Sequence, residues 1–252
     1  MIMTDFIDDI KNKNIVVTGA SSGIGRATCL RLSQLGANVI MIARREAELK
    51  KTYEMMSGEN HKYYVFDLSE LDKIDELVTS IVAENGKLDG LVHCAGYGPT
   101  RPLKVTTPTF MDEIMALNCL AFVELGRSYS KRRNNNAGSI VAISSMASLK
   151  GDKGKIAYCT SKSALDSAVR SMAVELKTKR IRVNSIQPGW VKTEMYNEYI
   201  KTAGKEVSQS IGMSLKNTLV APEEIANLVV FLLSNTSSAV SGASIIANAI
   251  GI

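Results

Sequence analysis

Tyr158 and Lys162 stand four positions apart in the sequence. Residues at this spacing lie on one face of a helix, so we expect the phenol and the ammonium group to point the same way. A free tyrosine has a pKa of about 10, and a nearby ammonium favours the phenolate and lowers that pKa. The pair predicts a tyrosine that exchanges a proton and a lysine that tunes it. Such pairs are also common on protein surfaces, so neighbouring motifs must decide between the two roles.

Two further polar features accompany this pair. Ser144 and Ser145 end a predicted strand, where a hydroxyl can hydrogen-bond a substrate oxygen as charge develops on it. Asn118 is a polar residue inside an otherwise apolar helical stretch. The alternative role for both features is to cap or satisfy nearby backbone groups.

A glycine-rich loop directly follows the first predicted strand and opens a helix. Glycines let the backbone approach a ligand closely, and a helix N-terminus presents unpaired N–H groups to an anion. The loop therefore predicts a site for the pyrophosphate of a dinucleotide, although its spacing departs from G-x-G-x-x-G and a plain turn is the alternative. Its residues are Thr18, Gly19, Ala20, Ser21, Ser22, Gly23, Ile24 and Gly25.

The end of the second strand predicts which dinucleotide binds. An acidic residue there bonds the ribose 2′-hydroxyl of NAD, whereas a basic residue accommodates the 2′-phosphate of NADP. Here the strand runs into Arg44 and Arg45, so Arg44 favours NADP(H) over NAD(H). Two solvated arginines at a helix start are the alternative. Asp67, after the third strand, is expected either at the adenine or as a helix N-cap.

Apolar runs and helical periodicity alternate along the whole chain. Strands separated by helices cannot pair as hairpins, so we expect a doubly wound α/β fold, with helices on both faces of a seven-stranded parallel sheet and ligands at the carboxyl ends of its strands. The absence of repeats and linkers favours a single domain over residues 1–252. Strands are expected at 15–18, 39–42, 63–66, 88–93, 139–143, 181–186 and 243–247; helices are expected at 26–35 and 71–84, after residue 42, and around Asn118, Tyr158 and Glu223.

Composition argues against several other classes of protein. The 252 residues carry a net charge of +5, with both signs scattered, so neither a nucleic-acid nor a membrane surface is expected. No run of 18 apolar residues and no export signal is visible. The four cysteines show no metal-site spacing, which favours reduced thiols, a cytoplasmic protein and no metal.

Three other features have ordinary structural interpretations. Cys159 is expected to be a packed thiol rather than a nucleophile. His93 is expected to pack at a strand end, because no acidic partner is adjacent. The basic run Lys131 to Arg133 is expected to be solvated, with binding of an acidic acyl carrier protein as the alternative.

Taken together, the motifs resemble the single-domain branch of the short-chain dehydrogenase/reductase family, and its 3-oxoacyl-[acyl-carrier-protein] reductase-like members in particular. The resemblance covers essentially the whole chain. It identifies the glycine motif at Thr18 to Gly25, and the segment Val183 to Thr193 looks like the family's loop over the nicotinamide. The matching catalytic positions are Asn118, Ser145, Tyr158 and Lys162.

The resemblance implies a Rossmann-like NADP(H)-dependent oxidoreductase that acts on a carbonyl or secondary alcohol. Tyr158 would exchange the proton, Ser145 would orient the substrate, Lys162 would also bind the nicotinamide ribose, and Asn118 would hold a water relay. A homotetramer or homodimer is implied as well. Cofactor contacts are implied for Gly19, Ser21, Ser22, Gly23, Ile24, Gly25, Arg44, Asp67, Leu68, Ala95, Gly96, Tyr158, Lys162, Pro188, Gly189, Val191 and Thr193.

Two segments depart from the family pattern. His93-Cys94-Ala95-Gly96 replaces the usual Asn-Asn-Ala-Gly, which alters the side-chain support of the cofactor loop. Ala247-Asn248-Ala249-Ile250 replaces the usual Val-Asp-Gly-Gly-like strand exit, near which subunits often meet.

The substrate stays open among ketoacyl thioesters, sugars, sterols and small ketones. Residues 192–217, with Met195, Tyr196, Tyr199, Ile200 and Met213, suit a mobile lid or an ordinary helix pair, and Trp190 is a candidate pocket wall. A non-catalytic NADP(H)-binding sensor or subunit is the rival function. A nucleotide-sugar epimerase or dehydratase is a second rival, and this chain lacks the extra length of those enzymes.

Overall fold

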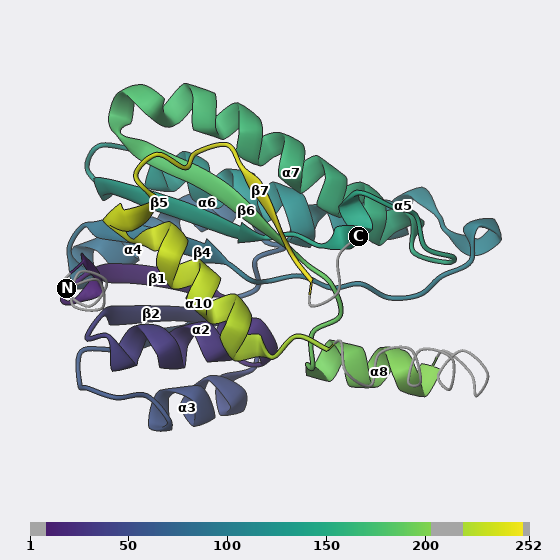
Figure 1. Ribbon diagram of the computed structural model, residues 1–252, viewed down its shortest axis with the longest axis horizontal. Helices are drawn as coiled ribbons and strands as arrows, with labels where there is room; N and C mark the ends of the chain where they lie inside the picture. Colours follow the sequence, from purple (N-terminus) through teal and green to yellow (C-terminus); the bar gives the residue numbers. More distant parts are fainter. Residues whose placement is uncertain (1–8, 203–218, 249–252) are drawn as a thin grey trace.

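The computed structural model describes residues 9–202 and 219–248. Their centre is one sheet of seven strands, all paired in parallel, in the order β3-β2-β1-β4-β5-β6-β7 (Figure 1). This confirms the predicted doubly wound fold class. The strands are β1 (Asn14–Thr18), β2 (Asn38–Ala43), β3 (Lys62–Val65), β4 (Leu88–His93), β5 (Asn135–Ile143), β6 (Ile181–Pro188) and β7 (Ser244–Ala247).

Helices cover both faces of this sheet. α2, α3 and α10 pack on one face and α4, α6 and α7 on the other, and Figure 1 shows α7 on the opposite side of the strands from α2 and α3. The helices are α2 (Gly23–Gln34), α3 (Glu46–Glu54), α4 (Ile74–Asn85), α5 (Pro108–Met115), α6 (Ala121–Tyr129), α7 (Ile156–Leu176), α8 (Glu194–Thr202) and α10 (Pro222–Leu233).

Alternation along the strands builds two separate cores. In β1, Ile15 and Val17 pack with the α2 side of the sheet, whereas Val16 packs with the opposite side. All three side chains are at most 1% exposed. Because both faces are covered, β1 is apolar from Ile15 to Val17 and β2 from Val39 to Ala43.

The strand order reverses between β1 and β4. The chain moves outward from β1 through β2 to β3, then returns to β4 on the other side of β1. The loops after β1 and β4 therefore leave the sheet in opposite directions and open a crevice at its carboxyl edge. Helices α5 and α8 project at this same end of the molecule (Figure 1).

Several boundaries differ from those expected. The first helix begins at Gly23 rather than Arg26, because its first turn is glycine-rich and carries no hydrophobic periodicity. The predicted helix 71–84 begins as a 3₁₀ turn, Leu71–Lys73, before α4. Strand β5 begins at Asn135 rather than at residue 139.

The region around Asn118 is helical but irregular. A π-helical turn, Ala116–Leu120, joins α5 to α6, and Asn118 lies in it. Such turns are frequent at functional sites, where they redirect one side chain. Among the described residues no helix is long and apolar enough to cross a bilayer, and no cluster of His, Cys, Asp and Glu is placed to hold a metal ion.

Candidate active site

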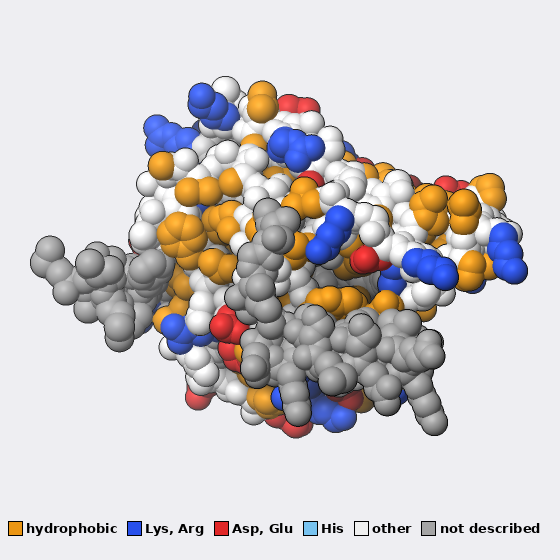
Figure 2. Space-filling view, turned by 45° about the vertical axis from the view of Figure 1, so that its right-hand side comes forward, with side chains coloured by type: hydrophobic (Ala, Val, Ile, Leu, Met, Phe, Trp, Pro, Cys, Tyr) orange, Lys and Arg blue, Asp and Glu red, His pale blue; other side chains and the backbone are white. Residues whose placement is uncertain are grey.

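A cavity of about 620 Å³ lies at the carboxyl edge of the sheet. Figure 2 is turned so that this end comes forward, and it shows hydrophobic side chains and both signs of charge around a hollow in the surface. The cavity brings together most of the predicted site residues. Those that line it are Gly19, Ser21, Ser22, Gly23, Ile24, Gly25, Arg44, Leu68, Ala95, Gly96, Ser145, Tyr158, Lys162, Pro188, Gly189, Val191 and Thr193; Asn118 and Asp67 do not.

Two glycines let the first loop cross the site. Gly19 has a φ of +65°, and a Cβ there would lie 2.7 Å from the Ala95 nitrogen. A Cβ at Gly25 would lie 2.2 Å from the Gly19 oxygen. Neither position has room for a side chain, so the backbones of the β1 and β4 loops and of α2 pack directly against one another.

The N-terminus of α2 faces this loop with its amide groups open. Its N-cap, Ser22, makes no side-chain cap hydrogen bond, and its first turn contains no acidic residue. Orphan N–H groups and the positive end of the helix dipole attract an anion. The residues present therefore fit the pyrophosphate of a dinucleotide.

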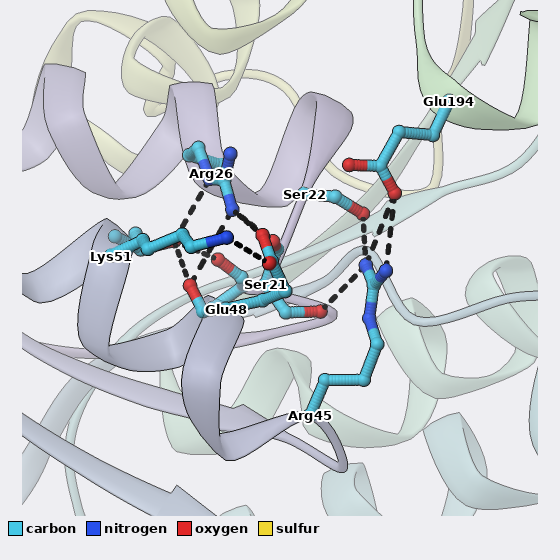
Figure 3. Close-up of polar contacts among 9 residues, drawn as sticks. Ser21, Ser22, Arg26, Arg45, Glu48, Lys51 and Glu194 are labelled. Atoms are coloured by element: carbon cyan, nitrogen blue, oxygen red, sulfur yellow. Dashed lines mark hydrogen bonds and ion pairs between the residues drawn. The ribbon is translucent and has the colours of Figure 1, made fainter.

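Arg45 reaches across to the same loop. Its Nη2 donates to Ser21 Oγ at 3.2 Å and to Ser22 Oγ at 2.8 Å, and its Nη1 lies 3.2 Å from Glu194 Oε2 at the start of α8 (Figure 3). The guanidinium thus links the β1 loop, the start of α3 and α8. The sequence predicted a role for Arg44 only; a second arginine at the same strand end was the available signal for Arg45.

Arg44 and Asp67 form a loose pair. Arg44 Nη1 lies 3.5 Å from Asp67 Oδ2, and the arginine side chain is 64% exposed. Asp67 also accepts hydrogen bonds from the backbone and the hydroxyl of Ser69, and these with Arg44 lower the pKa of Asp67 against an opposing effect of burial, which is the largest single contribution. Asp67 therefore stabilises the turn before the 3₁₀ helix, whose N-cap is Glu70, so it is not the helix N-cap named as its alternative role.

Asn118 is completely buried and bonds to a neighbouring loop. Its Oδ1 accepts from the Tyr97 amide at 2.8 Å, and its Nδ2 donates to the Tyr97 carbonyl at 3.0 Å and to Ser161 Oγ at 2.9 Å. The asparagine therefore fixes the loop after β4 against α7. Both of its N–H donors are used in this way, which leaves one lone pair on Oδ1.

Ser145 and Tyr158 meet in the cavity. Burial raises the pKa of Tyr158, and the nearby Ser145 hydroxyl, which favours the phenolate, opposes this rise only in part. The lowering expected from Lys162 is therefore wrong. Lys162 Nζ lies 5.9 Å from the centroid of the Tyr158 ring and is directed to another partner.

That partner is the Ile143 carbonyl, to which Lys162 Nζ donates at 2.7 Å. The lysine is 4% exposed, and burial lowers its pKa to about 8, opposed by the nearby charge of Asp166. An ammonium with this pKa remains largely charged at neutral pH. Ser144 lies alongside, where its hydroxyl donates to the Lys162 carbonyl at 3.4 Å and not into the cavity.

The altered loop after β4 has its own internal support. His93 Nδ1 and Thr18 Oγ1 lie 3.0 Å apart, and Thr18 Oγ1 also accepts from the Ala95 amide at 3.2 Å. Burial lowers the pKa of His93 to about 3 and raises that of Cys94 to about 12, so both side chains are neutral. The histidine has the packing role that was expected of it.

Aromatic residues line the other half of the cavity. Trp190 packs against Tyr199, with ring centroids 5.1 Å apart, and against Tyr196 at 5.8 Å. This agrees with the predicted pocket wall. Of the expected lid, Met195, Tyr196, Tyr199 and Ile200 lie in α8, whereas residues 203–217, including Met213, lie outside the described residues.

Lys155 is a cavity residue that the sequence reasoning missed. It precedes α7 directly and stands three positions before Tyr158. Residues at this spacing share one side of a helix, which was the available signal. Cys159 is partly buried and does not line the cavity.

Comparison with known proteins gives concordant matches. Residues 19–249 match the family model described as enoyl-(acyl carrier protein) reductase. The chain is 32% identical to L-xylulose reductase of Caenorhabditis elegans, over 94% of each chain, and 32% identical to the 3-oxoacyl-[acyl-carrier-protein] reductase FabG of Rickettsia bellii, over 95% of this chain and 97% of the relative.

Solved structures agree with these sequence matches. A short-chain alcohol dehydrogenase from Sinorhizobium meliloti, described as putative, superposes with a TM-score of 0.87 at 27% identity, over 95% of this chain and 96% of that chain. A short-chain type dehydrogenase/reductase from Mycobacterium ulcerans gives a TM-score of 0.84 at 29% identity, over 94% of this chain and 88% of that chain.

Asn118→Ala is expected to destabilise the protein by about 1–3 kcal/mol, because it removes both hydrogen bonds of Asn118 to the Tyr97 backbone and the buried donor to Ser161 Oγ. Urea unfolding measures this change. Asn136→Ala is the matched control, since Asn136 makes an exposed hydrogen bond to Asp89 and its loss should change stability by at most about 0.5 kcal/mol. Equal effects of the two substitutions would contradict the bracing role of Asn118.

Proposed function

Because the chain belongs to the short-chain dehydrogenase/reductase family, whose members are oxidoreductases of alcohols and carbonyls, we propose that it transfers a hydride between NADP(H) and a carbonyl or secondary alcohol. The supporting observation is that Tyr158, Ser145 and Lys162 line the same cavity as the loop Gly19 to Gly25. Acid–base groups thus lie beside a cradle suited to a dinucleotide.

Reduction adds a hydride to the carbonyl carbon and a proton to its oxygen. The nicotinamide, when bound, supplies the hydride. Tyr158 holds the proton on its phenolic oxygen, and its raised pKa keeps it there at neutral pH. Ser145, which lines the cavity with Tyr158, orients the substrate oxygen toward that proton.

Lys162 completes this set electrostatically. Its ammonium lies beside the tyrosine and stabilises the phenolate left after proton transfer. Its position also suits a contact with the nicotinamide ribose. The water relay through Asn118 stays a prediction, since the Asn118 amide already braces the Tyr97 loop.

Preference for NADP(H) over NAD(H) rests on the end of β2. Arg44 is exposed at the cavity with only a loose carboxylate partner, and Arg45 reaches the serines of the glycine loop. Two guanidinium groups at this end suit the 2′-phosphate. Leu68 and Asp67 would lie at the adenine, and Ala95, Gly96, Pro188, Gly189, Val191 and Thr193 along the remaining cofactor.

The proposal includes a cytoplasmic homotetramer or homodimer that acts on a small carbonyl or alcohol. Relatives named reductases for a sugar and for an acyl thioester support a small-molecule substrate without choosing between them. A non-catalytic NADP(H)-binding sensor is the rival function, and the first experiment below separates the two.

Tyr158→Phe is expected to lower kcat for carbonyl reduction by about 10²–10⁴-fold and to retain NADPH binding, because only the proton donor is removed. NADPH absorbance measures turnover with a panel of ketones, sugars, sterols and ketoacyl thioesters. Tyr53→Phe, on the exposed face of α3, is the control and should keep its activity. NADPH binding by the wild type without turnover of any carbonyl would favour the sensor.

The rate of carbonyl reduction should fall as pH rises through about 8. Below this pH both the Lys162 ammonium and the Tyr158 phenol are protonated, and above it Lys162 is the first to lose its charge. The profile of kcat/KM between pH 6 and 10 measures this. Lys162→Arg should move the fall to higher pH, since arginine keeps its charge. A flat profile to pH 10 would be inconsistent with this role for Lys162.

Arg44→Ala and Arg45→Ala should each weaken NADPH binding by about tenfold and NADH binding much less, because only NADPH carries the 2′-phosphate. Equilibrium fluorescence titration with both nucleotides measures the two affinities. Arg31→Ala, on the exposed side of α2 beyond the cavity, is the control. A parallel loss of both affinities, or no loss of either, would remove the argument for NADP(H).

A further inference from the structure

Lys155 places a positive charge in the half of the cavity beyond Tyr158. Its Nζ donates a short hydrogen bond to the Gly98 carbonyl and lies 4.9 Å from the ring centroid of Tyr199 and 6.0 Å from that of Tyr158. Gly98 itself packs on the Tyr158 ring, since a Cβ there would lie 2.8 Å from Tyr158 Cδ2. The ammonium therefore lies close to the acid–base group.

This charge is only partly compensated by the protein. Burial is the largest influence and lowers the pKa of Lys155, whereas Asp152 and Glu198 raise it through space. An ammonium has three donors, and the structure gives one of them to the Gly98 carbonyl. Among the ion pairs of the described residues, none includes Lys155. An incoming anion would regain the electrostatic energy that burial costs.

The aromatic residues around Lys155 shape the space for such an anion. Tyr199 connects the ammonium to Trp190, and Tyr158 closes the opposite side. Rings of this kind attract the lysine by cation–π interaction, which holds the ammonium in place without neutralising it. The carbon skeleton of a substrate would lie against these rings, with one charged end at Lys155.

We infer, on the basis of the proposed function, that Lys155 binds a carboxylate of the substrate, so that the substrate class is a keto acid and its product the hydroxy acid. The 6.0 Å between Nζ and the Tyr158 ring limits the carboxylate to a few bonds from the reacting carbonyl carbon. Tyr158 still supplies the proton and the nicotinamide the hydride, so Lys155 selects the substrate without entering the chemistry.

A purely structural role for Lys155 gives a different expectation. Through its bond to Gly98 the lysine also ties the β4 loop to the start of α7. Loss of that tie would affect charged and neutral substrates alike. The ratio of kcat/KM for an acid to kcat/KM for its methyl ester therefore isolates the effect of the Lys155 charge.

The first test compares acetoacetate with methyl acetoacetate, and levulinate with methyl levulinate. The wild type should reduce at least one acid with a kcat/KM about tenfold above that of its ester, and Lys155→Gln should bring this ratio toward one. Lys155→Arg should preserve the preference. Lys153→Gln, at an exposed position outside the cavity, should leave the ratio unchanged. No acid preference in the wild type, or the same preference in Lys155→Gln, overturns the inference.

The second test needs no turnover. Trp190 is the single tryptophan of the chain, so its fluorescence reports ligands in this half of the cavity. With NADP⁺ present and ionic strength constant, butyrate should bind more tightly than butyramide, and Lys155→Gln should remove the difference. Equal binding by the wild type overturns the inference. Lys155-dependent butyrate binding without reduction of any carbonyl would refute the proposed function and leave the anion site standing.

Discussion

The site depends on one steric constraint, the direct contact of three backbone segments at the point where strand order reverses. Gly19 crosses Ala95 with no room for a Cβ, and Gly25 approaches the Gly19 carbonyl even more closely. This packing brings the N-terminus of α2 to the crevice between β1 and β4. A side chain at either glycine would push α2 away from the sheet, and the open amides would no longer face the cavity that holds Tyr158.

Burial of Tyr158 and Lys162 is the second determinant, and it shifts the pKa values of the two groups in opposite directions. Desolvation lowers the pKa of Lys162 to about 8 and raises that of Tyr158 above its usual value, so the two pKa values move apart. The charge of Asp166, one helical turn further along α7, raises the pKa of Lys162 and so limits this decrease. The result is a protonated phenol beside a largely protonated amine at neutral pH. The low-dielectric surroundings strengthen every interaction with a developing oxyanion.

The sequence predicted the placement of residues well where a local pattern of residue types is compatible with one backbone geometry. The strand runs, the glycine loop and the spacing of Tyr158 and Lys162 each predicted the observed placement, because backbone geometry follows from local pattern. The sequence was a poor guide to electrostatic balance. The pKa of Tyr158 rises instead of falling because burial depends on residues distant in sequence. Asn118 was recognised as exceptional, yet its bonds to Tyr97 and Ser161 required the tertiary structure.

Arg45 and Lys155 are candidate residues for cofactor and substrate specificity in a fold that many relatives share. Each is a basic residue just before a helix, at positions whose only sequence signal is proximity to a motif. Arg45 is half exposed and bridges the glycine loop to Glu194, so its ion pair contributes little stability and its guanidinium can exchange one anion for another at small cost. Lys155 lies deeper, between aromatic rings, where a charge is costly unless something compensates it. A ligand that offsets this cost would explain such a charge, and under the proposed function the two cations select the two ends of the bound pair, the cofactor phosphate and the substrate anion.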